Sequence, residues 1–314
     1  MTLGMTTTGK LSRASYDSII EFDARHYTID SALLLALSDL YGRDVVLRGR
    51  GRWQRFAPLG KHDLDGYAAT LSHDVAVLGR WDNGERHLVA VGDNKMNERQ
   101  QCEHRDRAWQ AAEKARRVQQ AQRQQEHAQT ALRAHELWAK AMPTKDHAYL
   151  RRKGVAPGSN RQLGSLMLVP LVDGTRLVNV QTIATDGTKR FLKGGRKQGC
   201  YHPIGAFDTD RPLLICEGWA TGMTLHAETG LAVACAMDAG NLMPVARYLR
   251  SRYPGASIIV ACDNDHATVG NPGVTKGRAA AEAVGGRAIW PALDGIEGAS
   301  DYNDLALLDR EVAV

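Results

Sequence analysis

The chain has 314 residues, of which 43% are hydrophobic and 24% charged; this composition excludes wholesale disorder and a fibrous structure, and the length suggests two or three domains. The formal net charge of +5 and a pI near 9.0 fit a polyanionic partner without requiring one. No segment approaches the roughly 18 apolar residues of a membrane span, and residues 1–10 lack the apolar core of a secretory signal, so we expect a cytoplasmic protein with no membrane partner. The five cysteines are scattered without a C-x-x-C pair, which favours reduced thiols and no zinc.

The first part of the chain, residues 1–95, reads as a small α+β domain. Residues 16–41 carry the apolar spacing of a helix, and residues 44–92 read as short strands separated by glycines. Among these strands we expect residues 44–47 and 87–91.

Residues 96–142 contain neither glycine nor proline and are filled with the strong helix formers Ala, Gln, Arg, Glu and Lys. Through about Gln129 the segment has too few apolar residues for a coiled-coil seam. We therefore predict a long, solvated helix that links two domains, whose last part can dock by one face.

Residues 143–208 read as a basic, strand-rich subdomain. Strands at 166–172, 177–183 and 189–192, separated by Asp-Gly turns, predict an antiparallel meander. Its cations are Lys189, Arg190, Lys193, Arg196 and Lys197, with Arg151, Arg152 and Lys153 upstream. The Gly194-Gly195 pair lets backbone amides approach a phosphate, so this cluster could grip a template backbone or a nucleoside triphosphate; the alternative is a solvated basic turn.

Residues 209–314 repeat an apolar strand, a glycine-containing turn and an amphipathic helix, which predicts an α/β domain with a parallel sheet. We expect strands at 212–216, 231–236, 257–262 and 287–290, with helices at 220–228, 242–252 and 276–284. The chain has no G-x-x-x-x-G-K-[ST] motif, which excludes a P-loop motor.

Acidic residues follow two of these strands directly. Glu217 comes after the first strand, and Asp263 and Asp265 come after the third. Because ligands gather at the carboxyl ends of parallel strands, all three acids should face one crevice. Asp263 and Asp265 lie two residues apart on an extended segment, so both can reach one Mg²⁺ ion. The alternative is that such acids only cap helices and turns.

Two segments carry a family resemblance. Residues 213–222 read LLICEGWATG and residues 258–265 read IIVACDND. Both resemble the Toprim domain shared by bacterial-type primases, topoisomerases and some nucleases. Their sequences are most similar to those of the TraC-like primases of conjugative plasmids and phages. Similar elements occur in order along residues 130–310, and more loosely at 53–84. They are residues 147–154, 187–195, 238–242, 270–273 and 301–305.

The resemblance implies roles for the acids. Glu217 would act as a general base or metal ligand, and Asp263 and Asp265 would hold the catalytic Mg²⁺, which Mn²⁺ could replace. Asp301 and Asp304 would lie near a second metal or the incoming triphosphate. Cellular primases carry an aspartate where this chain has Thr221, and they usually have an N-terminal zinc ribbon for which this chain lacks the cysteines.

Two further basic elements are candidates for nucleotide or DNA contacts. Lys276 opens a helix after the metal-binding strand, where a triphosphate could be met. Around residues 48–56 cations alternate with aromatic residues, the composition of a platform on which single-stranded bases stack. Its candidate residues are Arg48, Arg50, Arg52 and Trp53. Core aromatics flanked by surface arginines would give the same pattern.

We predict a Mg²⁺-dependent DNA primase of a mobile element, which makes short RNA primers on single-stranded DNA from ribonucleoside triphosphates. A replicative helicase is a further candidate partner. Two other hypotheses remain open: a Toprim nuclease that uses the same metals for hydrolysis, and a non-catalytic protein that binds single-stranded DNA.

Overall fold

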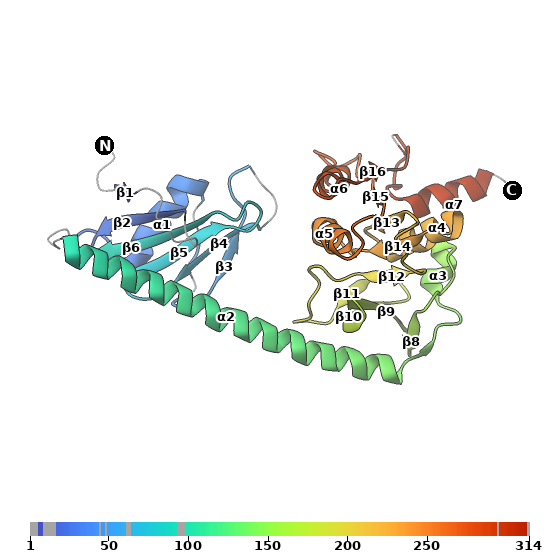
Figure 1. Cartoon of the computed structure of the whole chain (residues 1–314), viewed down its shortest axis with the longest axis horizontal. Coiled ribbons are helices and arrows are strands. Elements are labelled where there is room, and N and C mark those ends of the chain that lie inside the picture. Colours follow the sequence, from blue (N-terminus) through green and yellow to red (C-terminus); the bar gives the residue numbers. More distant parts are fainter. Residues whose placement is uncertain are drawn as a thin grey trace. The chain divides into compact units, whose positions relative to one another are not determined.

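In the computed structural model the chain forms two compact units, Met1–Gln122 and Arg123–Val314, and the division falls within the long helix α2 (Glu98–Lys140) (Figure 1). The structure describes residues 6–8, 17–43, 45–47, 49–60, 64–92, 98–293 and 295–312, with the backbone alone in a few of them. Arg48 and Asp44 lie outside the described residues. The predicted division into four parts remains a prediction.

The first unit is a six-stranded sheet with α1 (Ile29–Tyr41) on one face and the start of α2 on the other. The strand order is β1-β2-β6-β5-β4-β3, antiparallel except for the β2–β6 pair. The strands are β1 (Thr6–Thr8), β2 (Ser18–Asp23), β3 (Gln54–Phe56), β4 (Gly66–Thr70), β5 (Val75–Arg80) and β6 (Arg86–Gly92).

Two predictions for the first unit are wrong in part. Residues 18–23 form strand β2 rather than the start of a helix, because alternate residues of this segment face the two apolar layers. The helix begins only after Thr28, whose side chain accepts a hydrogen bond from the backbone N–H of Ser31 in a capping box. Residues 45–47 are irregular rather than a strand, whereas the strand predicted at 87–91 is confirmed as β6.

The predicted long helix is confirmed as α2. Its side chains between residues 113 and 133 are mostly exposed, which agrees with a composition that has no apolar stripe. Ala112 packs in the first unit, while Ala134 and Ala141 are buried in the second.

The second unit contains two five-stranded sheets. The antiparallel sheet has the order β11-β10-β9-β8-β7 and includes the predicted meander. Its elements are β7 (Met142–Pro143), α3 (Ala148–Lys153), β8 (Arg161–Leu163), β9 (Leu166–Asp173), β10 (Arg176–Ile183) and β11 (Lys189–Phe191).

The other sheet has the order β12-β14-β13-β15-β16 and is parallel except for the edge strand β12, which confirms the predicted parallel α/β architecture. Its elements are β12 (His202–Ile204), β13 (Leu213–Cys216), α4 (Trp219–Thr229), β14 (Ala232–Cys235), the 3₁₀ helix η1 (Ala239–Asn241), α5 (Leu242–Arg252), β15 (Ile258–Ala261), α6 (Pro272–Glu282), β16 (Arg287–Ile289) and α7 (Tyr302–Val312).

Apolar layers cover both faces of this parallel sheet. Helices α5 and α6 pack on one face. On the other face, α3, α4 and side chains of β9 and β10 share a single core, which includes Tyr149, Met167, Ile183 and Trp219. Asn303 of α7, only 1% exposed, strengthens this connection: its side-chain amide donates to the Lys153 carbonyl (2.8 Å) and to Thr224 Oγ1 (2.9 Å). The basic sheet and the parallel sheet are therefore joined through buried contacts.

Among the helices of the described residues, none combines the length and the apolar character that a membrane crossing needs.

Candidate metal and nucleotide site

The carboxyl ends of two neighbouring strands bring the predicted acids together. β13 and β15 pair in parallel with Cys216 opposite Ala261, so Glu217 and Asp263 leave the sheet at the same edge. Burial, and then the negative charges of Glu217, Asp301, Asp265 and Asp304, raise the pKa of Asp263 to about 8. These carboxylates therefore lie close enough to repel one another.

Two carboxylate oxygens at this edge have no partner among the residues that the structure describes. Glu217 Oε1 and Asp263 Oδ1 are both buried, and neither has a hydrogen-bond partner. Buried carboxylate oxygens without partners are costly unless a cation or a proton compensates them. Within the described part of the chain, no group of three or more His, Cys, Asp or Glu side chains has a metal-binding arrangement. This donor set suits Mg²⁺, which takes one or two protein carboxylates and completes its shell with water and phosphate oxygens.

Glu217 is poised to exchange a proton near neutral pH. Burial, and then the charges of Asp265 and Asp238, raise its pKa to about 7, although Lys276 and the backbone N–H of Ala239 act in the opposite direction. Lys276, predicted to meet a triphosphate, thus lies within electrostatic range of Glu217.

Asp265 holds the start of α6 by hydrogen bonds and also acts on Glu217 by its negative charge. Its Oδ2 accepts a hydrogen bond from the Gly273 N–H in the first turn of α6 (2.9 Å), and its own N–H donates to Asn271 Oδ1 (3.0 Å). Asn271 adopts a left-handed conformation with φ of 40° and caps α6. One oxygen of Asp265 is consequently used to hold α6, while its charge still acts on Glu217.

Asp301 and Asp304 form a reciprocal cap at the start of α7. Asp301 Oδ1 accepts from the N–H groups of Asn303 and Asp304 (2.8 and 2.9 Å), and Asp304 Oδ2 accepts from those of Ser300 and Asp301 (3.0 and 3.4 Å). Lys153 Nζ lies 2.9 Å from Asp304 Oδ1, and although burial opposes the shift, these partners lower the pKa of Asp304. The predicted role of the two aspartates near a second metal remains a prediction.

Thr221, in the first turn of α4, donates its hydroxyl to Asp301 Oδ2 (3.0 Å). Asp301 is one of the charges that act on Asp263. The threonine therefore orients an acid of this cluster and adds no carboxylate of its own.

The predicted basic cluster has diverse partners. Lys197 Nζ lies 3.6 Å from Asp238 Oδ2, and Asp238 acts on Glu217, so this end of the cluster reaches the acidic edge. Arg196 pairs with Asp173 (2.6 Å). The side chains of Lys189 and Arg152 lie over the ring of Tyr149, at 5.4 and 5.7 Å from its centre. Arg190, Lys193 and Arg151 are exposed, and Arg151 forms an ion pair with Asp146.

In the first unit, Arg50 and Arg52 are exposed, whereas Trp53 is partly buried, with its ring 5.6 Å from that of Tyr67. This packing agrees with the alternative of a core aromatic flanked by surface arginines. DNA contact at these residues remains a prediction.

Two residues that organise the site, Asp238 and Asn241, lie in the segment 238–242 that carries the family resemblance but were not among the predicted site residues. Asn241, 4% exposed, accepts from the Gly199 N–H (2.8 Å) and donates to the carbonyls of Cys200 (2.8 Å) and Ala236 (2.7 Å). It thereby ties the end of the basic cluster to the end of β14. Asp238, two residues beyond Ala236, follows Met237, a non-glycine residue with φ of 71°.

We expect Asn241→Leu to lower the free energy of unfolding by about 2–4 kcal/mol, because it leaves buried backbone groups without partners. Urea unfolding measures this change. Gln198→Leu, on the exposed part of the same loop, is the matched control and should change stability by no more than about 0.5 kcal/mol. Equal effects of the two substitutions would contradict the role of Asn241.

The raised pKa of Asp263 predicts how stability depends on pH without metal. Between about pH 4 and pH 8 the folded state keeps a proton that the unfolded chain has released, so stability falls as the pH rises through this window. Asparagine does not ionise, so the Asp263→Asn variant should not lose stability in this way as the pH rises. In EDTA at pH 8.5 we expect the variant to melt at least about 3 °C above the parent, with a smaller difference at pH 5. A melting-temperature difference that does not grow with pH would contradict the assignment.

Comparison with known proteins agrees with this geometry. Residues 212–309 match the family model of the Toprim domain. This segment is a Toprim domain, and the acids described above lie within it.

Two curated relatives are more specific. Both are named DNA primase TraC, from Escherichia coli. One is 39% identical over 193 residues, covering 58% of this chain and 18% of the relative; the other is 39% identical over 154 residues, covering 46% and 11%. The chain thus spans less than a fifth of the length of either relative. A solved structure described as "Structure of the DnaG primase catalytic domain bound to ssDNA" aligns with a TM-score of 0.38 and 14% identity over 62% of this chain and 78% of that chain.

Proposed function

We propose that this chain is a Mg²⁺-dependent DNA primase that joins ribonucleotides into short RNA primers on a single-stranded DNA template. The observation that carries the proposal is the pair of buried, unpartnered oxygens of Glu217 and Asp263 at the carboxyl edge of a Toprim domain. The sequence similarity to TraC primases supports synthesis rather than hydrolysis as the reaction.

Glu217 and Asp263, with the charge of Asp265 beside them, would hold the metal. When bound, Mg²⁺ neutralises the charge that develops on the transferring phosphate. Manganese would fit the same oxygens.

The chain's own residues then position the reactants. The 3′-oxygen of the primer forms a bond to the α-phosphorus of the incoming nucleotide, the bond to the leaving pyrophosphate breaks, and the hydroxyl proton passes to the Glu217 carboxylate. Lys276 would attract the triphosphate toward Glu217.

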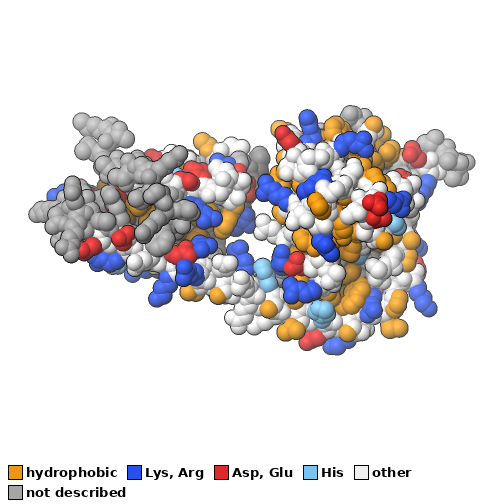
Figure 2. Space-filling model, in the orientation of Figure 1, with side chains coloured by type: hydrophobic (Ala, Val, Ile, Leu, Met, Phe, Trp, Pro, Cys, Tyr) orange, Lys and Arg blue, Asp and Glu red, His pale blue; other side chains and the backbone are white. Residues whose placement is uncertain are grey.

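The basic cluster would hold the template backbone. Figure 2 shows many Lys and Arg side chains on the visible face of the second unit and fewer Asp and Glu side chains. Lys197 connects the cluster to the acidic edge through Asp238. Single-stranded DNA and ribonucleoside triphosphates are thus the proposed ligands of a cytoplasmic enzyme, and a replicative helicase is a further proposed partner.

The test is incubation with single-stranded DNA, Mg²⁺ and labelled ribonucleotides. We expect short RNA products that disappear with Asp263→Asn and persist with Asp309→Asn, the same chemical change at an exposed site. The absence of product over a range of templates would refute the proposal. Cleavage of DNA without nucleotides would identify a nuclease, and DNA binding without either reaction would identify a binding protein.

A further inference from the structure

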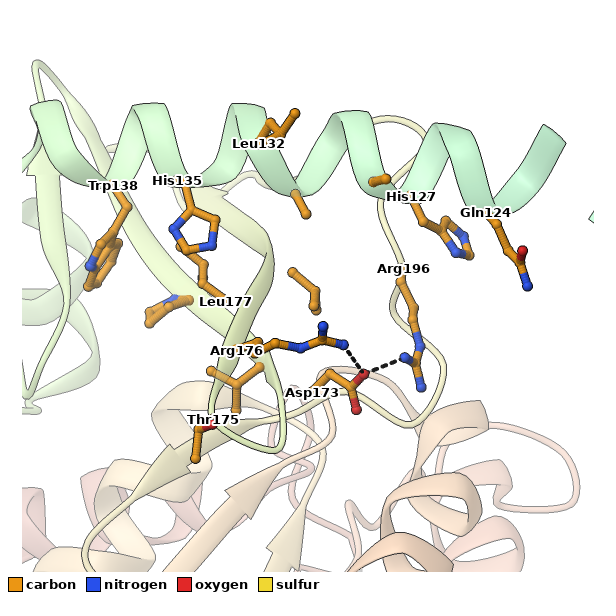
Figure 3. Close-up of a pocket in the computed structure, with 15 residues that line it drawn as sticks. Gln124, His127, Leu132, His135, Trp138, Asp173, Thr175, Arg176, Leu177 and Arg196 are labelled. Atoms are coloured by element: carbon orange, nitrogen blue, oxygen red, sulfur yellow. Dashed lines mark hydrogen bonds and ion pairs between the residues drawn. The ribbon is translucent and has the colours of Figure 1, made fainter. Parts of the chain in front are cut away.

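A groove of about 1060 Å³ lies between the C-terminal half of α2 and the β9–β10 hairpin (Figure 3). Pro170, Val172 and Leu177 of the hairpin contribute apolar surface, and Leu132 of α2, 66% exposed, contributes more. All residues that line this groove belong to the second unit, and none is an acid of the candidate metal site.

Rings follow one another along the α2 side of the groove. His127, His135 and Trp138 are spaced by eight and three residues, which places them on one face of the helix, and they point toward the hairpin (Figure 3). The guanidinium of Arg161 lies 4.8 Å from the centre of the Trp138 ring and fixes its position. Planar rings of this kind stack on the bases of a single strand.

Cations occupy the opposite wall. Asp173 Oδ2 lies 2.6 Å from Arg196 Nη1 and 3.6 Å from Arg176 Nη2 (Figure 3), and Asp173 is the only acid among the residues that line the groove, all of which are described. A guanidinium has five N–H donors, so each arginine can still donate to a phosphate. Burial, and then the positive charges of Arg123 and Arg196, lower the pKa of His127. This end of the groove thus carries positive charge without an equal number of acids.

The groove is continuous with the basic cluster. Arg196 belongs to both, and the Thr130 hydroxyl of α2 donates to the carbonyl of Lys193 (3.2 Å). A strand held at Lys193 and Arg196 therefore lies at the mouth of the groove.

We propose that single-stranded DNA continues from the basic cluster into this groove, with phosphates at Arg176 and Arg196 and bases against the rings of His127, His135 and Trp138. The identity of the strand rests on the proposed function. The charge balance favours a polyanion over the apolar face of a partner protein, because the groove offers two arginines against one carboxylate.

The first test measures the affinity of the full chain for fluorescent oligothymidylate as a function of salt. Arg176→Glu should weaken binding at least about fivefold. It should also reduce the slope of the logarithm of the binding constant against the logarithm of the salt concentration by about one. Arg133→Glu, the same charge change at an exposed position of α2 that does not line the groove, should stay within about twofold. His135→Ala should also weaken binding at least about fivefold, through lost stacking.

The second test locates the strand. An oligonucleotide that contains iodouracil, irradiated while bound, should form adducts on the α2 peptide that carries His135 and Trp138. If Arg176→Glu and His135→Ala bind oligothymidylate as tightly as the parent chain and the adducts form elsewhere, the proposal is overturned. The groove would then be a candidate site for an apolar partner.

These readouts separate the groove from the reaction. DNA binding and adduct formation need no nucleotides, so they can succeed when primer synthesis is absent, which would refute the proposed function alone. Primer synthesis together with adducts outside α2 would refute the groove alone.

Discussion

The Glu217→Gln and Asp263→Asn variants are each expected to make primers about 10²–10³-fold more slowly than the parent chain. Each substitution keeps the shape of the side chain but removes the charge of one of the two buried oxygens that lack partners. If both oxygens hold one ion, as proposed, the double variant should be little slower than either single variant. Single-turnover extension of a labelled primer with Mg²⁺ measures all three rates.

Asp309→Asn controls for the change from acid to amide and should retain the parent rate. If the double variant lost the product of the two single effects, the two acids would act independently and the shared ion would be excluded. Melting temperatures with and without Mg²⁺ provide a second readout: the ion should stabilise the parent and leave both single variants nearly unchanged.

Gly277→Ala should lower the free energy of unfolding by about 1–3 kcal/mol, because a methyl group built at Gly277 overlaps the sulfur of Cys262. Cys262 directly precedes Asp263, so the displaced sulfur would also disturb the candidate metal site. We therefore expect both stability and primer synthesis to fall, with chemical denaturation as the measure of the first.

Cys262→Ala makes room for the added methyl group, and the double variant should recover most of the lost stability. Gly255→Ala is the matched control: a methyl group at Gly255 has no neighbour within 4 Å, so the change should stay within about 0.5 kcal/mol. Equal losses at positions 255 and 277 would contradict the packing explanation.

Most of the parallel sheet was predictable because β13, β14 and β15 are short, wholly apolar runs, each followed by a helix. Strand β12 (His202–Ile204) was missed because three residues with a central proline give no strand pattern, and pairing with β14 alone defines it. The wrong prediction of a helix from residue 16 has a similar origin. Residues 18–23 form strand β2 because they pair with β1 and β6, and the spacing of their apolar residues does not reveal this pairing.

The acids at the ends of β13 and β15 could be predicted because strand order converts sequence position into proximity. The cap formed by Asp301 and Asp304 also had a local signal, an acid three residues after another at a helix start. By contrast, the contact between Lys197 and Asp238 joins segments that are distant in sequence, and no local pattern encodes it.

The buried amide of Asn303, together with the core that α3, α4, β9 and β10 share, sets a lower limit on how far this protein can be trimmed. A fragment that starts at residue 209 would uncover Trp219 and leave Asn303 without the Lys153 carbonyl. Such a fragment should aggregate when produced alone, and recombinant versions intended for crystallisation should begin upstream of Met142.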